Sequence, residues 1–395
     1  MATTAQQIRS WTGPTILSFG FRPFFLLAGI WAALAMVLWV LFLSGGIALP
    51  TAFDAVSWHA HEMLFGYLGA VFAGFLMTAV PNWTGRLPVV GWPLACLVLT
   101  WLAGRLAVAL SGYDPVAAAV VDMAFPLSLA LVIGREVIAG RNIRNLPVLA
   151  LLAGFVAGNL LYHLSAFQGE FAAEGLGFRL GISVAVMMIA LIGGRIVPSF
   201  TGNWLAKRGS RYRPVPFSPV DRAILLYSLA ALMLWIALPV HQATAIALVP
   251  AGIAHLWRLS RWHGHRTVAE PLVWILHVGY LFVPLGFLST AAAAVGWLTP
   301  GTALHVWMAG AIGVMTMAVM TRASLGHGGR PMTATPMTQV AYLLLLGAVV
   351  ARFAYGLGAN SDLLLHLSAG FWIAAFATFV ISYWTVLVRP RRSEP

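Results

Sequence analysis

Apolar runs of about 20 residues follow one another along almost the whole chain, and short polar connections separate them. A bilayer core about 30 Å thick is crossed by about 20 residues of α-helix, so each run is long enough to span it. The pattern therefore predicts twelve membrane-spanning helices. Their ranges are 22–44, 56–80, 92–111, 116–139, 146–165, 178–198, 219–238, 241–262, 270–295, 302–321, 336–356 and 362–388.

The composition agrees with this pattern. Hydrophobic residues make up 60% of the 395 positions and charged residues only 9%, whereas soluble domains carry about 25% charged residues. The N-terminal stretch MATTAQQIRSWTGP lacks the apolar core and cleavage site of a signal peptide, so we expect the first run to remain as a helix. The one cysteine, Cys96, excludes an intrachain disulfide and a thiolate cluster. We predict an all-α polytopic membrane protein, a single domain over residues 1–395.

Basic residues are concentrated in alternate connections, for example at Arg86, Arg211 and Arg266. The intervening connections carry acidic residues such as Asp114 and Glu170 and almost no basic ones. By the positive-inside rule, both termini are predicted to be cytoplasmic. The predicted cytoplasmic segments are an N-terminal tail (1–20), a loop (199–218) and a C-terminal tail (389–395). The net charge of +12 then reflects topology, and we predict no nucleic-acid partner.

The pentapeptide WHAHE, residues 58–62, stands at the entrance of the second apolar run. Ionisable side chains at membrane depth are costly and usually mark a functional site, and imidazole is the commonest protein ligand for transition metals. Because a helix turns about 100° per residue, His59 and His61 point in different directions and are expected to serve different centres. Glu62 lies three residues from His59 and is a candidate to orient an imidazole or to carry protons.

The predicted topology sorts the histidines by depth. Any one of them alone would be explained as an interfacial or packing side chain, but five at one outer level predict a metal-binding layer. These five are His59, His61, His163, His305 and His366. His277 and His327 lie near the inner face and predict a second cofactor region, with His277 as a haem ligand. Imidazole favours haem iron and copper, and without a C-x-x-C-H motif the haem would be held non-covalently.

Two charged residues lie inside neighbouring apolar runs. Arg105 and Asp122 stand at similar distances from the SGYDP turn that joins the two runs, so an antiparallel hairpin brings them to one depth. We predict a structural ion pair, with a role in holding a haem propionate as the alternative. Arg352 is the stronger propionate candidate because it shares the outer histidine level.

Four stretches together resemble the NnrS family: FGFRPFFLLAGIWA, WHAHEMLFGYLGAVFAGFLMTAVPNWTGR, GGRIVPSFTGN and VMTRASLGHGGRP. The resemblance covers nearly the whole chain. It implies a twelve-helix bacterial inner-membrane protein that carries haem b and copper and is tied to nitric oxide metabolism. The motif positions that it carries over are Arg22, Pro23, His59, His61, Glu62, Pro81, Asn82, Arg195, Pro198, Asn203, His277, His305, Arg322 and His327.

Three functions compete at this point. The first is a nitric oxide reductase, in which two NO, two electrons and two protons give N₂O and water, with Glu62 as the proton carrier. The second is a non-catalytic protein that handles NO or metal and protects against nitrosative stress. The third is a transporter, since twelve helices suit many carriers. The chain shows no soluble electron-transfer domain, so electrons for a reductase would come from quinol or a separate protein.

Overall fold

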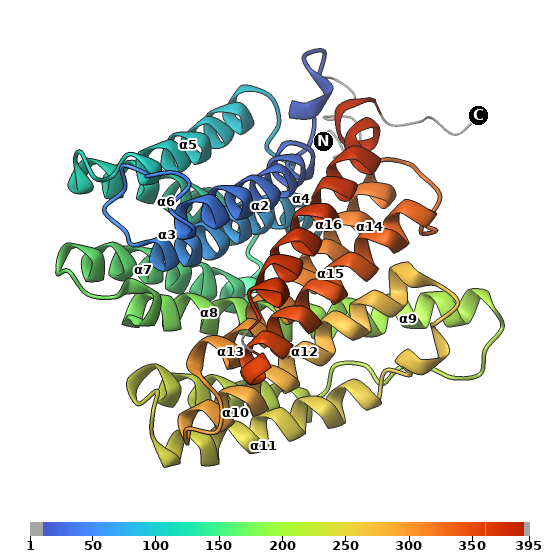
Figure 1. Ribbon diagram of the computed structural model, residues 1–395. Helices are drawn as coiled ribbons and strands as arrows, with labels where there is room; N and C mark the ends of the chain where they lie inside the picture. Colours follow the sequence, from blue (N-terminus) through green and yellow to red (C-terminus); the bar gives the residue numbers. More distant parts are fainter. Residues whose placement is uncertain (1–10, 360, 391–395) are drawn as a thin grey trace. The chain divides into compact units, whose positions relative to one another are not determined.

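The computed structural model describes residues 11–359 and 361–390, and within these ranges every regular element is a helix (Figure 1). Eleven of the described helices are long and apolar enough to cross a membrane, which confirms the predicted class of multi-pass helical membrane protein. They are Phe21–Leu43, Ala55–Thr84, Trp92–Ala109, Pro115–Ala139, Ile143–Phe167, Leu176–Lys207, Pro219–Ala237, Pro271–Ala294, Pro300–His327, Pro336–Gly358 and Asp362–Val388.

The remaining predicted span, 241–262, forms helix α11 (Gln242–Ser260) and is not among these eleven. It has 19 residues, but polar side chains lower its hydropathy. Thr244, His255 and Arg258 are all fully buried, so its polar positions face neighbouring helices. The twelfth span and the cytoplasmic termini therefore stay predictions. Residues 1–10 of the predicted tail 1–20 and residues 391–395 of the tail 389–395 lie outside the described residues.

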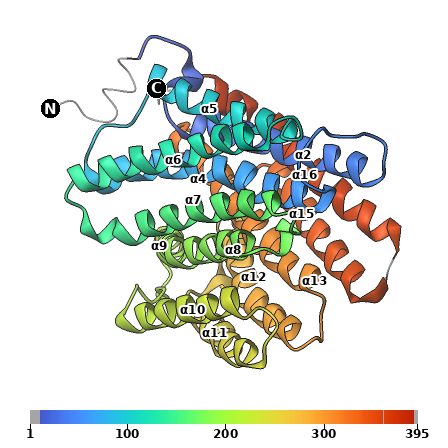
Figure 2. The same ribbon diagram turned by 90° about the vertical axis from the view of Figure 1, so that its left-hand side faces the viewer.

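The chain divides into two compact units. The first takes in the chain up to Gly181, with residues 323–331 and the segment from Phe379 onward. Within it, α4 packs against α2 and α6, and α6 packs against α5 and α7 (Figure 2). Its helices are α2 (Phe21–Leu43), α3 (Ala55–His61), α4 (Leu68–Thr84), α5 (Trp92–Ala109), α6 (Pro115–Ala139) and α7 (Leu146–Phe167).

The second unit comprises Ile182–Arg322 and Met332–Thr378, and α12 packs there against α9, α11 and α13. Its helices are α9 (Gly194–Lys207), α10 (Pro219–Ala237), α11, α12 (Pro271–Ala294), α13 (Pro300–His305) and α15 (Pro336–Ala354). Three helices contribute to both units: α8 (Leu176–Met188), α14 (Met315–His327) and α16 (Asp362–Val388). Short 3₁₀ turns cover Thr15–Leu17, Ile143–Asn145, Ala172–Glu174 and Gly264–Arg266.

Three of the described spans contain a π-helical segment, a feature that frequently marks functional sites. The first of these segments begins at Glu62, directly after His61, and joins α3 to α4. It therefore interrupts the regular α-helical periodicity inside the histidine motif. The three segments are Glu62–Tyr67, Ile189–Gly193 and Val306–Val314, and at Tyr355–Ala359 the chain instead kinks at Gly358, whose φ is 97°.

The predicted loop 199–218 is shorter than expected. The prediction ended the helix at Pro198, but the structure continues α9 to Lys207. Proline inside a helix removes one backbone donor and can be accommodated without ending the helix. Near the end of α9, the Arg208 guanidinium stacks 4.3 Å from the Trp204 ring. The connection between α9 and α10 is thus confined to residues 208–218.

The predicted orientation can be tested with reporter fusions. Fusions after Arg211 and Arg266 should report a cytoplasmic location, and fusions near Asp114 and Glu170 a periplasmic one, because cytoplasmic connections carry the excess of arginine and lysine. A periplasmic signal at Arg211 would reverse the orientation and place the histidine motif at the cytoplasmic face.

Candidate metal centre

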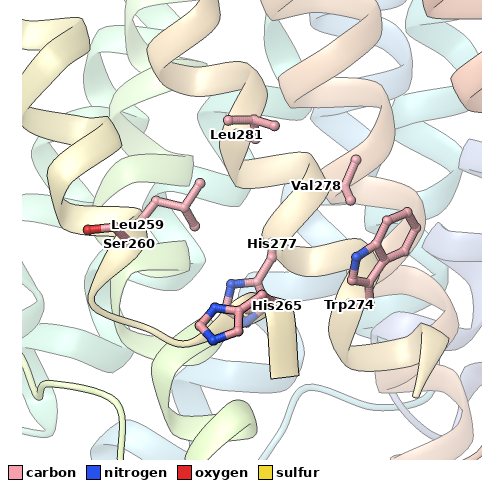
Figure 3. A pocket seen from close by; sticks show the side chains of 8 residues that line it. Leu259, Ser260, His265, Trp274, His277, Val278 and Leu281 are labelled. Carbon is pink, nitrogen blue, oxygen red and sulfur yellow. The ribbon is translucent and has the colours of Figure 1, made fainter. Parts of the chain in front are cut away.

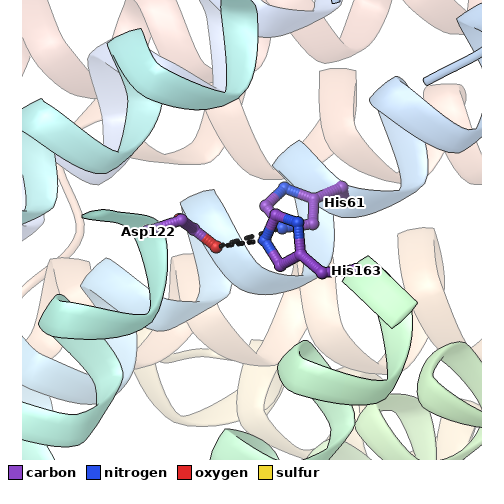
Figure 4. Close-up of side chains that lie close together, drawn as sticks. All are labelled: His61, Asp122 and His163. Carbon is purple, nitrogen blue, oxygen red and sulfur yellow. Dashed lines mark hydrogen bonds and ion pairs between the residues drawn. The ribbon is translucent and has the colours of Figure 1, made fainter. Parts of the chain in front are cut away.

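Two histidines and an aspartate from three helices of the first unit converge in its interior (Figure 4). His61 ends α3, Asp122 lies in α6 and His163 lies in α7. One ligand atom from each lies within 4.8 Å of the other two. Asp122 Oδ2 is 3.0 Å from His163 Nε2 and 3.3 Å from His61 Nε2. All three side chains are buried, so the structure creates a small polar centre inside an apolar bundle.

Local features hold the end of α3 in place. Asp54 caps the helix, and its Oδ1 accepts hydrogen bonds from the backbone N–H groups of Val56 and Ser57 at 2.9 Å. The Tyr162 hydroxyl from α7 donates to the Ser57 carbonyl at 2.8 Å. Helix α3 is thereby tied to α7 one turn before His61, which sets the imidazole at a defined depth.

Asn159 completes the centre, although the sequence analysis did not identify it. Its Nδ2 donates to Asp122 Oδ2 at 2.7 Å, and its Oδ1 lies 3.0 Å from His61 Nε2. Asn159 precedes His163 by four residues on α7, so the two side chains lie on one helix face. The i, i+4 spacing of Asn159 and His163 in GNLLYH could have indicated that the two side chains lie on one helix face.

The predicted ion pair between Arg105 and Asp122 is confirmed, and it belongs to a larger network. Arg105 Nη2 donates to Asp122 Oδ1, while Nη1 lies 2.7 Å from each carboxylate oxygen of Glu62. Trp31 Nε1 also donates to Glu62 Oε2 at 2.7 Å. The alternative of a propionate anchor is not supported, because both terminal nitrogens of Arg105 already have carboxylate partners.

The imidazole that Glu62 contacts belongs to His61, with 3.1 Å between Glu62 Oε1 and His61 Nδ1. Helical spacing had placed Glu62 beside His59 instead. The Glu62 carboxylate also pairs with Arg105, and this pair holds it beside His61. His59 points elsewhere and stacks on the Trp39 ring, with 4.2 Å between ring centroids. The two histidines thus point in different directions, and their roles at two different metal centres stay a prediction.

The positive and negative charges of this network do not balance. With both imidazoles neutral, Arg105 contributes one positive charge and Glu62 and Asp122 one negative charge each, which leaves a net single negative charge. Buried charge is costly unless it is compensated. Both ring nitrogens of His61 face oxygen acceptors, an arrangement that suits a protonated imidazole. One proton, or one monovalent cation in its place, makes the centre electrically neutral.

The donor set fits a metal ion better than a macrocycle. Two imidazole nitrogens and one carboxylate oxygen suit copper and similar transition metals, and Glu62 on the far nitrogen of His61 is the outer partner that ligating histidines usually have. The rings of Phe53, Phe65 and Tyr162 each lie 5.4 Å from the His61 ring. These rings crowd the His61 imidazole, so the surroundings of this centre favour a single ion over a macrocycle, and the predicted role of His61 toward haem stays a prediction.

The other predicted outer histidines lie in the second unit. His305 Nδ1 is 2.6 Å from the Gly301 carbonyl, and His366 Nδ1 is 2.7 Å from the Asp362 carbonyl. Of the five histidines predicted at one level, the structure brings His61 and His163 together. The metal-binding roles of His305 and His366 stay predictions.

The residues predicted for haem are distributed over both units. In the first unit, the His327 ring packs against Phe19 and Phe21, with centroids 5.4 and 5.6 Å apart. In the second unit, His277 Nε2 lies 2.8 Å from Thr201 Oγ1. The pairing of His277 with His327 as haem ligands stays a prediction.

Four arginines named in the sequence analysis have structural contacts, and three of them belong to the motifs of the resemblance. Arg22 donates to three carbonyl groups at the end of α16, those of Val386, Leu387 and Arg389, at 2.8–3.1 Å. A cation is favourable at this end of a helix dipole. Three more arginine guanidinium groups stack on aromatic rings at 4.0–5.4 Å, namely Arg195 on Phe217, Arg322 on Phe200 and Arg352 on Tyr355. Roles of Arg195 and Arg352 toward a cofactor stay predictions.

Comparison with known protein families gives one match that covers nearly the whole chain. The profile of the NnrS protein matches residues 15–391. The comparison with curated proteins gave no match. Because the NnrS profile covers nearly the whole chain, the chain belongs to the NnrS family, which is linked to nitric oxide metabolism or response.

Proposed function

We propose that this protein binds copper at the His61–Asp122–His163 centre and reduces nitric oxide there to N₂O, in the inner membrane of a bacterium. The observation that supports this most strongly is the convergence of the three ligand atoms within 4.8 Å in a buried site. The family link to nitric oxide supplies the substrate. Nitric oxide is small and uncharged, so it can reach a centre inside the bilayer without a polar channel.

The residues at this centre would have separate roles. His61, His163 and Asp122 would hold the ion, and copper bound there would supply an open position for NO and a one-electron couple. Glu62 accepts the hydrogen bond from His61 Nδ1 and keeps Nε2 directed at Asp122. Formation of N₂O and water consumes two protons for two NO. Glu62 and His61 are the hydrogen-bonded pair next to the ion that could pass such protons on.

A non-catalytic NO-binding protein is the second candidate, and one observation favours it. Both oxygens of Glu62 are occupied by Arg105, and Trp31 holds one of them as well. A carboxylate fixed in this way is well suited to balance charge, whereas a proton carrier needs to exchange partners. In this case the centre would bind NO stoichiometrically without releasing N₂O.

The two candidates are separated by measuring products. We expect the purified, copper-loaded protein to consume NO and form N₂O with a chemical reductant. Glu62→Gln should keep its copper but lower the rate by about 10²–10⁴-fold, the usual contribution of a proton-transferring group. The matched control is Glu136→Gln, a glutamate paired with Arg86 and Arg135 outside the centre. NO binding without N₂O would support the non-catalytic candidate, and an unchanged rate in Glu62→Gln would contradict the proton role.

A further inference from the structure

Basic side chains are concentrated on two connections of the second unit, one after α9 and one after α11. The segments 207–218 and 258–269 together contain seven arginine or lysine residues and no Asp or Glu. Arg258 and Arg261 pair with the buried Asp221. The other five are exposed and have no carboxylate partner among the residues that the structure describes. These five, here called the basic face, are Lys207, Arg208, Arg211, Arg213 and Arg266.

The ring of Tyr212 joins the two connections into one surface. The Arg266 guanidinium lies 3.5 Å from the centroid of this ring, and the Arg211 guanidinium lies 5.3 Å from it. The backbone N–H of Val215 also donates to the Arg261 carbonyl at 3.3 Å. Two arginines that are distant in the sequence are therefore held around a single aromatic ring.

The positive charge of the basic face is not neutralised by the chain itself. Arg211 Nη2 donates to the Tyr212 hydroxyl at 3.3 Å, and this bond, together with the charge of Arg266, lowers the pKa of the Tyr212 phenol. Like charges on neighbouring segments repel each other, so an anion between them is favourable. A guanidinium that stacks on a ring still has N–H donors at its edge, and these suit phosphate oxygens. The basic face is thus suited to bind a phosphate group.

An open cavity of about 320 Å³ lies beside the same turn, between the end of α11 and the first half of α12 (Figure 3). His265, which directly precedes Arg266, lines this cavity and is exposed. The wall is largely apolar, with Leu259, Trp274, Val278 and Leu281 among its lining residues. Val278 and Leu281 are partly exposed along α12. A hydrocarbon chain can therefore lie against this wall from outside the helices.

Charge and apolar surface together identify the ligand. Soluble phosphate would leave the apolar wall uncovered, and an uncharged lipid would leave the basic face uncompensated. The basic face also follows directly after the candidate span Leu176–Lys207, at the level of lipid head groups, where clusters of four to eight basic residues are typical of anionic-lipid sites. We propose that Arg211 and Arg266 bind the phosphate of an anionic phospholipid and that one of its acyl chains lies in the cavity between α11 and α12. This binding is independent of the proposed copper centre.

Native mass spectrometry of the full-length protein in an uncharged detergent measures the binding. Phosphatidylglycerol is compared with phosphatidylcholine of the same chain length, and the protein should bind the anionic lipid about tenfold more tightly. Added salt should weaken this preference, because it screens exposed charges. The double variant Arg211→Gln/Arg266→Gln is expected to bind phosphatidylglycerol about tenfold more weakly or worse, a loss of about 1.4 kcal/mol or more. Its melting temperature in detergent without lipid should match that of the wild type.

The position of the acyl chain is tested separately. Val278→Trp places a large side chain in the cavity and should weaken phosphatidylglycerol binding by about tenfold, because the chain loses its apolar contacts. The matched control is Leu285→Trp, since Leu285 is exposed on the same helix but does not line the cavity. Glycerol phosphate carries the anionic group without a chain, and it should compete far more weakly than the lipid does.

The control for charge is Arg135→Gln/Arg144→Gln, which removes two exposed arginines from the first unit and should bind phosphatidylglycerol as the wild type does. Equal binding of the two lipids by the wild type would overturn the proposal. So would unchanged binding of phosphatidylglycerol by Arg211→Gln/Arg266→Gln, or an equal loss in Arg135→Gln/Arg144→Gln. Competition by glycerol phosphate as strong as that of the lipid would also overturn it and leave a site for a soluble anion.

Discussion

Replacing Arg105 with methionine is expected to lower the free energy of unfolding by about 3–5 kcal/mol, the usual cost of removing one partner from a buried ion pair. Arg105 is 4% exposed and pairs with two carboxylates, Glu62 and Asp122, that are fully buried. Its removal leaves two uncompensated negative charges beside the His61 ring. Methionine keeps an unbranched apolar side chain, so the loss of stability reports the missing charge more than any change in packing. Equilibrium unfolding in mixed micelles measures the change.

The matched control is Arg86→Met. Arg86 also pairs with a glutamate, Glu136, but its side chain is 43% exposed. Water and salt screen such a pair, and its loss should cost only about 0–1 kcal/mol. Similar destabilisation by the two substitutions would contradict the assignment of the Arg105 network as a buried, charge-compensated centre.

Replacing Asp122 with asparagine is expected to reduce bound copper to background. The substitution removes the one anionic ligand and raises the net charge of the centre by one unit, so that a bound cation is no longer compensated. Metal content of the purified variant, measured by mass spectrometry, checks this. Asp114→Asn is the control on the same helix, because Asp114 caps α6 through Ala117 N and asparagine caps equally well. Full copper content in Asp122→Asn would contradict the proposed ligand set.

Most of the membrane-spanning helices could be predicted, because the partitioning of a segment into the lipid bilayer depends on the composition of that segment. The run predicted at 362–388 is helix α16, Asp362–Val388, and the run predicted at 22–44 is α2, Phe21–Leu43. The Arg105–Asp122 pair was predicted by similar reasoning. Two antiparallel helices joined by a short turn place residues that are equally distant from the turn at the same depth in the membrane. Helix α11 marks the limit, because its buried polar side chains make it less apolar than a typical span.

The candidate centre was predicted only in part. Membrane depth grouped His61 with His163, and both lie in the centre, but depth also grouped them with His59, which faces Trp39 instead. Asn159 was missed. Depth follows from the position of a residue along its own helix, whereas contact also requires that the helix be rotated toward the correct neighbour.

The sequence by itself determined the class of protein, the positions of most membrane-spanning helices and which imidazole and carboxylate side chains are present. These properties depend on the composition of each segment and not on the segments that pack against it. The tertiary structure decided which groups meet. Glu62 pairs with Arg105 and His61, and the packing of α3, α6 and α7 brings Asp122 between two imidazoles. The tertiary structure also left His277 Nδ1 without a hydrogen-bond partner, buried against the Gly264 turn. Helix rotation and lateral order are set by side-chain packing between segments distant in sequence, and the hydrophobic pattern of one helix carries no information about its neighbour.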